Sequence, residues 1–301
     1  MALSAIFMPS PRRPVPTGLF FTFHFFMFIL SDSGSTKTDW MLVNNGEPVV
    51  KVQTHGINPV HLDTADITRL LTEELPPAVR QAEVSCVFFY GAGCIAPYDQ
   101  KLHTVLNRLF GCPVEVGSDL LGAARATCGT EAGLVCILGT GSNSCLYDGN
   151  KIVSNTPPLG YILGDEGSGA ALGKLFLNAL YKKRLSEQTL MQFQVWSRNT
   201  YNDVIRKVYR EPLPNRFLAS LAPFIAEHID EEPLRQLVKQ NFRNFFHYNL
   251  APYGEPQMPL HAVGSIAWHF RELLEETARE EGYHLATVEK SPIDGLLRYH
   301  K

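Results

Sequence analysis

A short loop of small and hydroxyl-bearing residues follows an apolar run near the start of the chain. The run ends at Leu30, and Asp32 comes almost directly after it. Such a loop can hold a polyphosphate, because backbone N–H groups approach phosphate oxygens closely where side chains are small. We expect Asp32 to hold Mg²⁺ through water, since Mg²⁺ keeps most of its hydration shell. The predicted phosphate-binding residues are Gly34, Ser35, Thr36, Lys37 and Thr38. An ordinary tight hairpin is the alternative for the loop, and a solvated strand residue is the alternative for Lys37.

A second loop of the same kind follows the apolar run at residues 134–138. Its predicted phosphate-binding residues are Gly139, Thr140 and Gly141, which precede Ser142 and Asn143. The loop is not a Walker A loop, because no Lys-Ser/Thr pair follows at the required spacing. Two strand-to-loop phosphate sites in one chain predict two half-molecules that face one nucleotide.

Asp119 stands where an expected strand at residues 114–116 gives way to an expected helix at 119–128. A carboxylate at the carboxyl edge of a central strand points into the cleft where ligands bind such sheets. It could accept a hydroxyl proton during phosphoryl transfer. The alternative role is a helix N-cap, and Ser118 is the other candidate for that cap.

Asp165 and Glu166 lie between two glycines, Gly164 and Gly167. Glycines on both sides predict a tight cleft wall that presents Asp165 to a polar ligand. The alternative is a solvent-exposed helix start, where acidic residues are favoured in the first turn.

Two further turns carry weaker signals. Asn58 precedes Pro59 and is therefore held extended. A structural turn is the default interpretation there, and a contact with a sugar hydroxyl is the alternative. Gly264 and Ser265 end a strand and start a helix, where the backbone can lie against an adenine or a ribose. A plain helix cap explains that pair equally well.

The hydrophobic pattern predicts an α/β protein. The first half reads as β-β-β-α-β-α-β-α, which indicates a mixed sheet with crossover helices. The second half starts at Leu134 and partly repeats this plan. It continues with a mostly helical stretch at 187–253, a strand at 260–263, a helix at 266–281, a strand at 285–288 and a helix at 293–299. We therefore expect an N-terminal domain over 23–130 and a C-terminal domain over 131–291, with a helical insertion at about 187–253.

The net charge and the cysteine positions limit which partners and which cellular compartment we expect. The net charge of −3 provides no basic stripe for a polyanion, so we expect no nucleic acid as partner. None of the six cysteines forms a Cys-x-x-Cys pair, and most lie in apolar surroundings. We interpret them as buried, reduced thiols of a cytoplasmic protein.

The N-terminal segment resembles a signal-peptide core, because Arg12 and Arg13 precede an apolar run at 18–30. The run is too short to span a bilayer and has no small-residue cleavage site. Cleavage after it would also remove the strand that carries Asp32. We expect no membrane association, and we interpret residues 1–22 as a leader that is disordered or non-native.

The motifs together resemble the actin-like ATPase superfamily. Within it they resemble the BadF/BadG/BcrA/BcrD group, which includes N-acetylglucosamine kinases. The resemblance runs from about Phe25 to the C-terminus and rests on four motifs in order. These are the first phosphate motif Asp32-Ser-Gly-Ser-Thr-Lys-Thr, the second phosphate motif Gly139-Thr-Gly-Ser-Asn143, the sugar-domain signature Gly164-Asp-Glu-Gly-Ser168 and the adenosine motif Val263-Gly-Ser-Ile-Ala267.

The resemblance implies two ribonuclease-H-like domains, each a mixed sheet flanked by helices, with the active-site cleft between them. The last helix, at 292–301, would pack back on the first domain. The implied activity is transfer of the γ-phosphoryl group of ATP, with Mg²⁺, to a hydroxyl of an amino sugar, with N-acetylglucosamine favoured. Asp119 would be the catalytic base, and a homodimer is implied. The implied sugar-binding residues are Asn58, Asn143, Asp165 and Glu166, and the implied nucleotide-binding residues include Gly264 and Ser265.

One departure from the family pattern concerns the sugar. Leu159 stands where N-acetylglucosamine kinases often carry a tryptophan that packs on the ring. An aliphatic side chain does not stack on a ring in the same way, so glucosamine or another amino sugar remains an alternative. Two other functions remain open within the group: an ATPase activator of a radical dehydratase, which would need iron–sulfur cysteines, and a non-catalytic sugar-sensing regulator.

Overall fold

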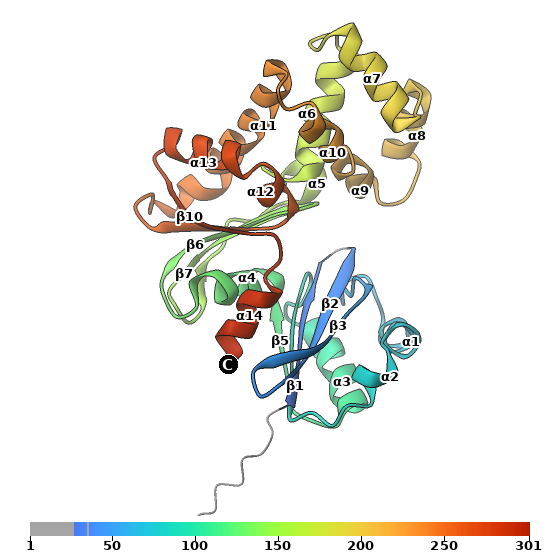
Figure 1. The fold of residues 1–301 in the computed structure, drawn as a ribbon, viewed down its shortest axis with the longest axis vertical. Helices are drawn as coiled ribbons and strands as arrows, with labels where there is room; N and C mark the ends of the chain where they lie inside the picture. Colours follow the sequence, from blue (N-terminus) through green and yellow to red (C-terminus); the bar gives the residue numbers. More distant parts are fainter. Residues whose placement is uncertain (1–26, 35) are drawn as a thin grey trace, which may run out of the picture.

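A computed structural model describes residues 27–34 and 36–301. The predicted leader at 1–22 and the predicted phosphate contact of Ser35 lie outside the described residues. The described chain forms two lobes stacked along the long axis of the molecule (Figure 1). None of the helices in this part of the chain is long and apolar enough to cross a membrane.

The first lobe is built on a five-stranded mixed sheet with the order β3-β2-β1-β4-β5. Strand β1 is antiparallel to β2, which is antiparallel to β3, while β1, β4 and β5 are parallel. The carboxyl ends of β1, β3, β4 and β5 therefore lie at one edge of the sheet. The bounds are β1 (Met27–Ser33), β2 (Lys37–Asn44), β3 (Glu47–His55), β4 (Cys86–Gly91) and β5 (Val114–Ser118).

Alternate residues of the central strands enter two different cores. Ile29 packs with the helices α1 and α3 on one face, whereas Phe28 and Leu30 pack with the last helix on the other. The strand is apolar on both faces because both faces are covered. The helices of this lobe are α1 (Thr64–Glu74), α2 (Pro77–Arg80), α3 (Asp99–Phe110) and α4 (Asp119–Cys128).

The second lobe repeats the sheet with the order β10-β9-β6-β7-β8. Strands β6 and β9 are parallel, and β7 is antiparallel to both β6 and β8. The carboxyl ends of β6, β8 and β9 therefore share one edge, as in the first lobe. The bounds are β6 (Gly133–Leu138), β7 (Ser142–Tyr147), β8 (Ile152–Ser154), β9 (Pro259–Val263) and β10 (His284–Glu289).

Helices cover this second sheet and form an extended cap above it (Figure 1). They are α5 (Gly160–Leu163), α6 (Gly169–Tyr181), α7 (Glu187–Ser197), α8 (Tyr201–Tyr209), α9 (Pro214–Ala219), α10 (Ala222–Glu227), α11 (Glu232–Phe245), the π-helical turn η1 (Phe246–Leu250), the 3₁₀ turn η2 (Ala251–Tyr253), α12 (Ser265–His269) and α13 (Arg271–Glu280).

The helix predicted at 266–281 is wrong as a single element. It is interrupted at Phe270, whose backbone leaves helical geometry with φ −111° and ψ 27°. The aromatic side chain is only 4% exposed and belongs to the core of the second lobe. Sequence periodicity does not detect such a break, because the apolar spacing continues across it.

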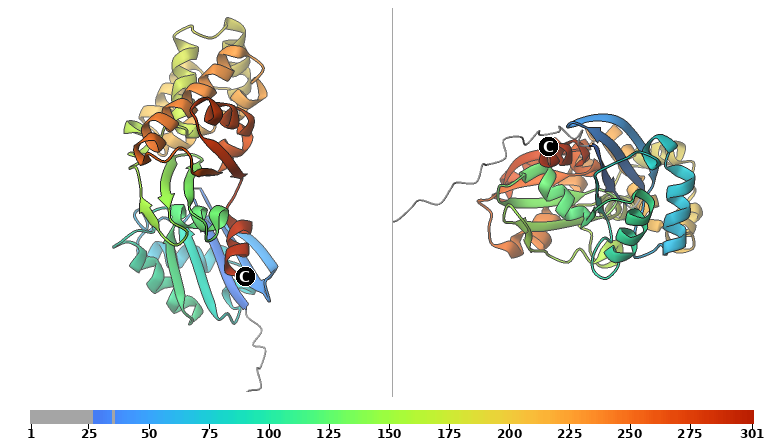
Figure 2. Two further views of the ribbon diagram at one scale, coloured as in Figure 1. Left: turned by 90° about the vertical axis from the view of Figure 1, so that its left-hand side faces the viewer. Right: turned by 90° about the horizontal axis from the view of Figure 1, so that it is seen from below.

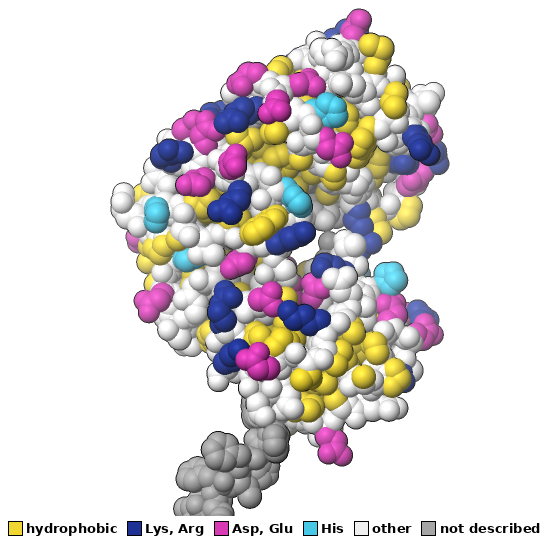
Figure 3. All heavy atoms as spheres, viewed as in Figure 1, with side chains coloured by type: hydrophobic (Ala, Val, Ile, Leu, Met, Phe, Trp, Pro, Cys, Tyr) yellow, Lys and Arg dark blue, Asp and Glu magenta, His cyan; other side chains and the backbone are white. Residues whose placement is uncertain are grey.

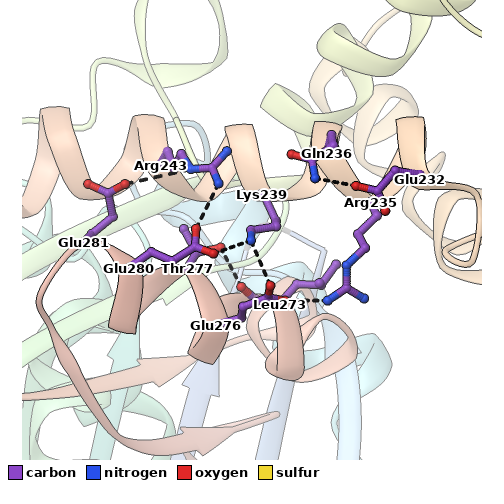
Figure 4. A network of polar contacts seen from close by, with 10 residues as sticks. All are labelled: Glu232, Arg235, Gln236, Lys239, Arg243, Leu273, Glu276, Thr277, Glu280 and Glu281. Atoms are coloured by element: carbon purple, nitrogen blue, oxygen red, sulfur yellow. Dashed lines mark hydrogen bonds and ion pairs between the residues drawn. The ribbon is translucent and has the colours of Figure 1, made fainter.

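An ion-pair network joins the end of the helical insertion to α13 (Figure 4). Lys239 on α11 donates to Glu276 at 2.9 Å and to Glu280 at 2.6 Å. Arg235 and Arg243 flank it and pair with the same two carboxylates. This network fastens α11 in place, and α11 in turn contacts α6 and the loop before it.

Two helices cross between the lobes. Helix α4 runs from β5 of the first sheet to β6 of the second, and α14 (Ile293–His300) returns from β10 to pack on α4 and β1 (Figure 2). The two helices approach closely at Gly295, where a Cβ atom would lie 2.4 Å from the Ala126 carbonyl oxygen. The Tyr90 hydroxyl and the His300 Nε2 atom form a hydrogen bond of 2.9 Å, which joins α14 to β4.

Candidate active site

Asp32 lies at the carboxyl end of β1, directly opposite Asp39 on β2. Burial raises the pKa of Asp32 to about 7, and the negative charges of Asp39 and Asp119 add to the effect, while Lys37 opposes it. Lys37 pairs with the Asp39 carboxylate at 2.9 Å. The three carboxylates make this edge of the sheet negative, which suits a cation. Sequence reasoning did not assign Asp39, although the hairpin register would have placed it beside Asp32.

The first loop is anchored from beneath by Ser33 and Thr38, whose hydroxyl oxygens lie 2.8 Å apart. The Ser33 hydroxyl also donates to the Ile57 carbonyl at 3.0 Å and accepts the Ile57 N–H at 2.9 Å. Thr38 is fully buried and donates to the His55 carbonyl. In this structure Thr38 therefore supports the loop from within, whereas Gly34 and Thr36 are exposed on it.

The loops after β3 and β4 interlock beside Asn58. The Asn58 side-chain oxygen accepts the Val60 N–H at 2.9 Å. Gly93 has a left-handed backbone, and a Cβ atom there would lie 2.1 Å from that same oxygen. Cys94 is buried next to this turn. Its burial, and to a smaller extent the nearby charge of Asp119, raise the pKa of its thiol to about 12. The Gly91–Gly93 turn, which sequence reasoning left without a role, thus joins Asn58 to the surroundings of Asp119.

Asp119 is the first residue of α4, and it is not the helix cap. The cap is Ser118, whose hydroxyl oxygen accepts the Leu121 N–H at 3.1 Å. The Asp119 carboxylate accepts the Leu120 N–H at 2.8 Å. Burial raises the pKa of Asp119, and the hydrogen bonds from the helix start oppose that rise. The carboxylate is therefore available to a ligand at the carboxyl edge of the first sheet.

The second loop sits on the first turn of α6. The Gly169 N–H donates to the Gly139 carbonyl at 2.8 Å, and the Ala170 N–H donates to the Thr140 carbonyl at 3.1 Å. The loop closes on itself through the Gly139 N–H and the Gly141 carbonyl, 2.9 Å apart. These bonds hold the loop rigidly at the carboxyl end of β6.

Gly264 packs directly against the strand that feeds the second loop. Its φ of 122° is open to glycine, and a Cβ atom would lie 2.3 Å from the Leu138 carbonyl oxygen. Ser265 follows as an exposed first residue of α12. The structure thus brings the second phosphate motif and the adenosine motif together.

Asp165 is buried at 8% exposure, with φ at +59°, and burial raises its pKa. The Ser142 N–H approaches its carboxylate at 3.5 Å, and a Cβ atom on Gly141 would lie 3.1 Å from it. The cap of α6 is Ser168, whose hydroxyl accepts the Ala171 N–H. The alternative of an exposed helix start is therefore wrong for Asp165, which lies against the second loop.

Glu166 and Asn143 are each held by one amide side chain. Glu166 accepts from Asn249 at 3.1 Å. The Asn143 side-chain oxygen accepts from Asn155 at 2.9 Å, and its amide nitrogen has no partner among the described residues. Asn249 lies in the helical insertion far along the sequence, so no local signal marked it.

A hollow lies between the two lobes (Figure 3), and the carboxyl ends of β6, β8 and β9 form one edge of the second sheet. The strap at 155–164 leaves β8 at that edge, and its Leu159 is 63% exposed with φ at +61°. A separate groove of about 540 Å³ between α1 and α3 contains none of the predicted site residues. The carboxyl edges of the two sheets carry two loops of small residues, the carboxylates of Asp32, Asp39 and Asp119, and polar side chains, a set of groups that suits phosphoryl transfer to a hydroxyl group.

Two solved structures of candidate N-acetylglucosamine kinases are similar to this chain over most of its length. A candidate N-acetylglucosamine kinase from Porphyromonas gingivalis is 46% identical, with a TM-score of 0.89, over 91% of this chain and 98% of that one. A candidate N-acetylglucosamine kinase from Chromobacterium violaceum is 20% identical, with a TM-score of 0.72, over 92% and 99% of the two chains.

A more distant neighbour shows the same fold. It is a ROK-family glucokinase from Streptomyces griseus in complex with glucose and AMPPNP, 16% identical with a TM-score of 0.58, over 91% of this chain and 97% of that one. No family model and no curated protein matches the sequence. The fold is that of the two-domain, actin-like ATPase sugar kinases.

Proposed function

Because this chain belongs to the N-acetylglucosamine kinase-like family of actin-like ATPase proteins, we propose that it is an ATP-dependent amino sugar kinase. It transfers the γ-phosphoryl group of ATP to a hydroxyl of the sugar, and N-acetylglucosamine is the first candidate substrate. The observation that carries the proposal is the Asp119 carboxylate at the carboxyl end of β5. Ser118 caps α4 in its place, and Asp119, which accepts the Leu120 N–H, keeps acceptor capacity for a ligand.

The reaction needs one proton acceptor. The acceptor hydroxyl oxygen bonds to the γ-phosphorus as the bond from that phosphorus to the β–γ bridging oxygen breaks, and ADP leaves. Asp119 takes the hydroxyl proton, and burial suits it to this task because a raised pKa makes a carboxylate a stronger base. Most of the remaining catalysis comes from positioning and electrostatics.

The nucleotide would lie between the two loops. From the first lobe, backbone N–H groups and side chains at Thr36 and Lys37 would contact its phosphates, and those at Thr140 and Gly141 would do so from the second. Gly34 and Gly139 donate their own N–H groups to the Lys37 and Gly141 carbonyls, and they would instead let the backbone approach the phosphates closely. Gly264 and Ser265 face the adenosine. The acidic edge at Asp32 fits a hydrated Mg²⁺, because hard cations prefer carboxylate oxygen and Asp39 adds negative charge. When bound, Mg²⁺ neutralises charge on the phosphates.

The sugar would lie beside Asp119. Asp165, Glu166 and Asn143 from the second lobe and Asn58 from the first are the residues proposed to bind its hydroxyl and amide groups. Asp165 and Glu166 share one loop that α11 holds in place. The exposed Leu159 would offer the sugar an aliphatic side chain in place of an aromatic ring on which to stack. Glucosamine therefore remains the main competitor of N-acetylglucosamine as the natural substrate.

The test is a coupled assay of ADP release with ATP and Mg²⁺ against N-acetylglucosamine, glucosamine, N-acetylmannosamine, glucose and no sugar. Strong stimulation by one amino sugar, abolished by EDTA and restored by excess Mg²⁺, is the expected result. ADP release that no sugar stimulates would overturn the proposal.

A further inference from the structure

Helix α11 and the π-helical turn η1 present three side chains, spaced four residues apart, to the loop at 164–168. Asn241 accepts the Gly167 N–H at 3.1 Å and donates to the Ser168 carbonyl at 3.1 Å. Phe245 packs on Gly167, where an added Cβ atom would lie 2.8 Å from the Phe245 Cβ. Asn249 donates to the Glu166 carboxylate at 3.1 Å. These three side chains thus contact the part of the loop from Glu166 to Ser168.

The π turn explains how Asn249 reaches that loop. Eight residues of regular α-helix at about 3.6 per turn would carry Asn249 about 80° around the axis from Asn241. The wider π turn over Phe246–Leu250 adds less rotation per residue. Asn249 therefore returns to the face that carries Asn241 and Phe245. Single π turns of this kind frequently occur at functional sites.

The two asparagine side chains that contact the loop are buried. Asn241 is 1% exposed and Asn249 is 2% exposed, and buried amide side chains are retained where their hydrogen bonds are satisfied. The Asn249 backbone carbonyl also accepts from the Ser144 hydroxyl at 3.3 Å, next to Asn143 on β7. The turn therefore contacts both β7 and the loop at 164–168 in the proposed acceptor site.

We propose that Asn249 is a positioning residue for the sugar: it fixes the Glu166 carboxylate in its binding position, and the π turn serves to bring it there. This inference rests on the proposed function, because it assigns Glu166 to the sugar. Asn249 does not touch the reacting atoms. Its removal should weaken sugar binding through Glu166 while the chemical step and the nucleotide site remain intact.

The kinetic test compares Asn249→Ala with Asn244→Ala, a control on the solvent side of α11 whose side chain, within the described part of the chain, bonds only to Gln240. Asn249→Ala should raise the sugar KM about tenfold with kcat and the ATP KM within about threefold of the wild type, and the control should change none of them. A sugar KM within about twofold of the wild type would overturn the proposal. So would a fall in kcat accompanied by a rise in both the sugar KM and the ATP KM.

A double-mutant cycle tests whether Asn249 acts through Glu166. Combining Asn249→Ala with Glu166→Ala should give the sugar KM of Glu166→Ala alone, because residues that act as a unit are non-additive. Additive effects would contradict the inference. If Asn249→Ala unfolds, Asn249→Ser keeps a polar group too short to reach Glu166, and the same comparisons apply to it.

Hydrogen exchange separates this inference from the proposed function. Without ligand, Asn249→Ala should accelerate exchange in a peptide covering Gly164–Gly169 about tenfold or more and leave β2 unchanged. Unchanged exchange at the loop would refute the positioning role. If no sugar stimulates the wild type, the proposed function fails, and accelerated exchange still shows that Asn249 holds the loop.

Discussion

Ser118 and Asp119 divide two tasks at the start of α4. The Ser118 hydroxyl caps the helix through the Leu121 N–H at 3.1 Å, and the neighbouring Asp119 carboxylate accepts the Leu120 N–H at 2.8 Å at the carboxyl end of β5. Adjacent residues that both suit an N-cap could have exchanged these roles. Their assignment decides whether the cleft holds a base.

The first prediction separates the two residues. Asp119→Asn should lower kcat about a thousandfold, because an amide cannot accept the hydroxyl proton, and should leave nucleotide affinity within a few-fold. Ser118→Ala is the matched control, which should lose about 1 kcal/mol of stability and keep most turnover. Steady-state kinetics, calorimetric nucleotide binding and urea unfolding measure the three quantities. An Asp119→Asn enzyme that keeps more than about a tenth of the turnover would refute the assignment of the base.

The second prediction concerns pH. A carboxylate attracts a cation only when ionised, and burial with the charges of Asp39 and Asp119 raises the pKa of Asp32 to about 7. The kcat/KM for ATP with Mg²⁺ should therefore fall as the pH drops through about 7. Asp39→Asn removes one like charge and frees Lys37, and both changes lower the pKa of Asp32. The acid limb should move to lower pH in this variant, and an unmoved limb would show that Asp32 does not control it.

The third prediction tests the close approach at Gly264. Gly264→Ala places a methyl group 2.3 Å from the Leu138 carbonyl oxygen at a φ of 122°. Gly254→Ala is the control, because Gly254 has a φ of 70° and no atom within 4 Å of an added Cβ. The control should lose about 1–2 kcal/mol from backbone strain alone. Gly264→Ala should lose more and should also raise the ATP KM, since the second loop must shift. Equal losses in urea unfolding would mean that the contact with Leu138 carries no energy.

The fourth prediction concerns the network around Lys239, whose side chain is 6% exposed (Figure 4). Its hydrogen bonds lower the pKa of Glu276 and of Glu280 below their usual 4.5. A lowered carboxyl pKa in the folded state adds stability that is present above pH 4.5 and is lost as the pH falls through the folded-state pKa. Lys239→Met should lower the Tm at pH 7 by several degrees and flatten the decline of Tm below pH 4.5.

Lys182→Met is the control for that comparison. Lys182 is an exposed lysine of the same lobe and is not part of the network. Its substitution should leave both the Tm and its pH dependence near those of the wild type. A Lys239→Met protein with the wild-type acid profile would show that the network does not couple protonation to folding.

Local patterns were enough to predict most elements and the loops between them. Pro76 lies between α1 and α2 and Pro77 begins α2, because proline is tolerated at a helix start and not in a helix interior. The strands were visible as apolar runs, and the two phosphate loops followed directly from small residues at strand ends. The interruption at Phe270 was not visible, because a buried aromatic residue fits helical spacing equally well on either side of a break.

The amino-acid sequence by itself determined which residues could do chemistry: the two loops of small and hydroxyl-bearing residues, the carboxylates at strand ends and the acidic turn at Asp165. These signals are local, since they depend on backbone freedom and on side-chain type within a few residues. Only the tertiary structure decided their roles. It made Ser118, and not Asp119, the cap of α4, buried Thr38 beneath the first loop, and packed Gly264 against Leu138. It also brought Asn249 to Glu166 across 83 positions of sequence, because that contact depends on the packing of α11 and on the rotation of one π turn.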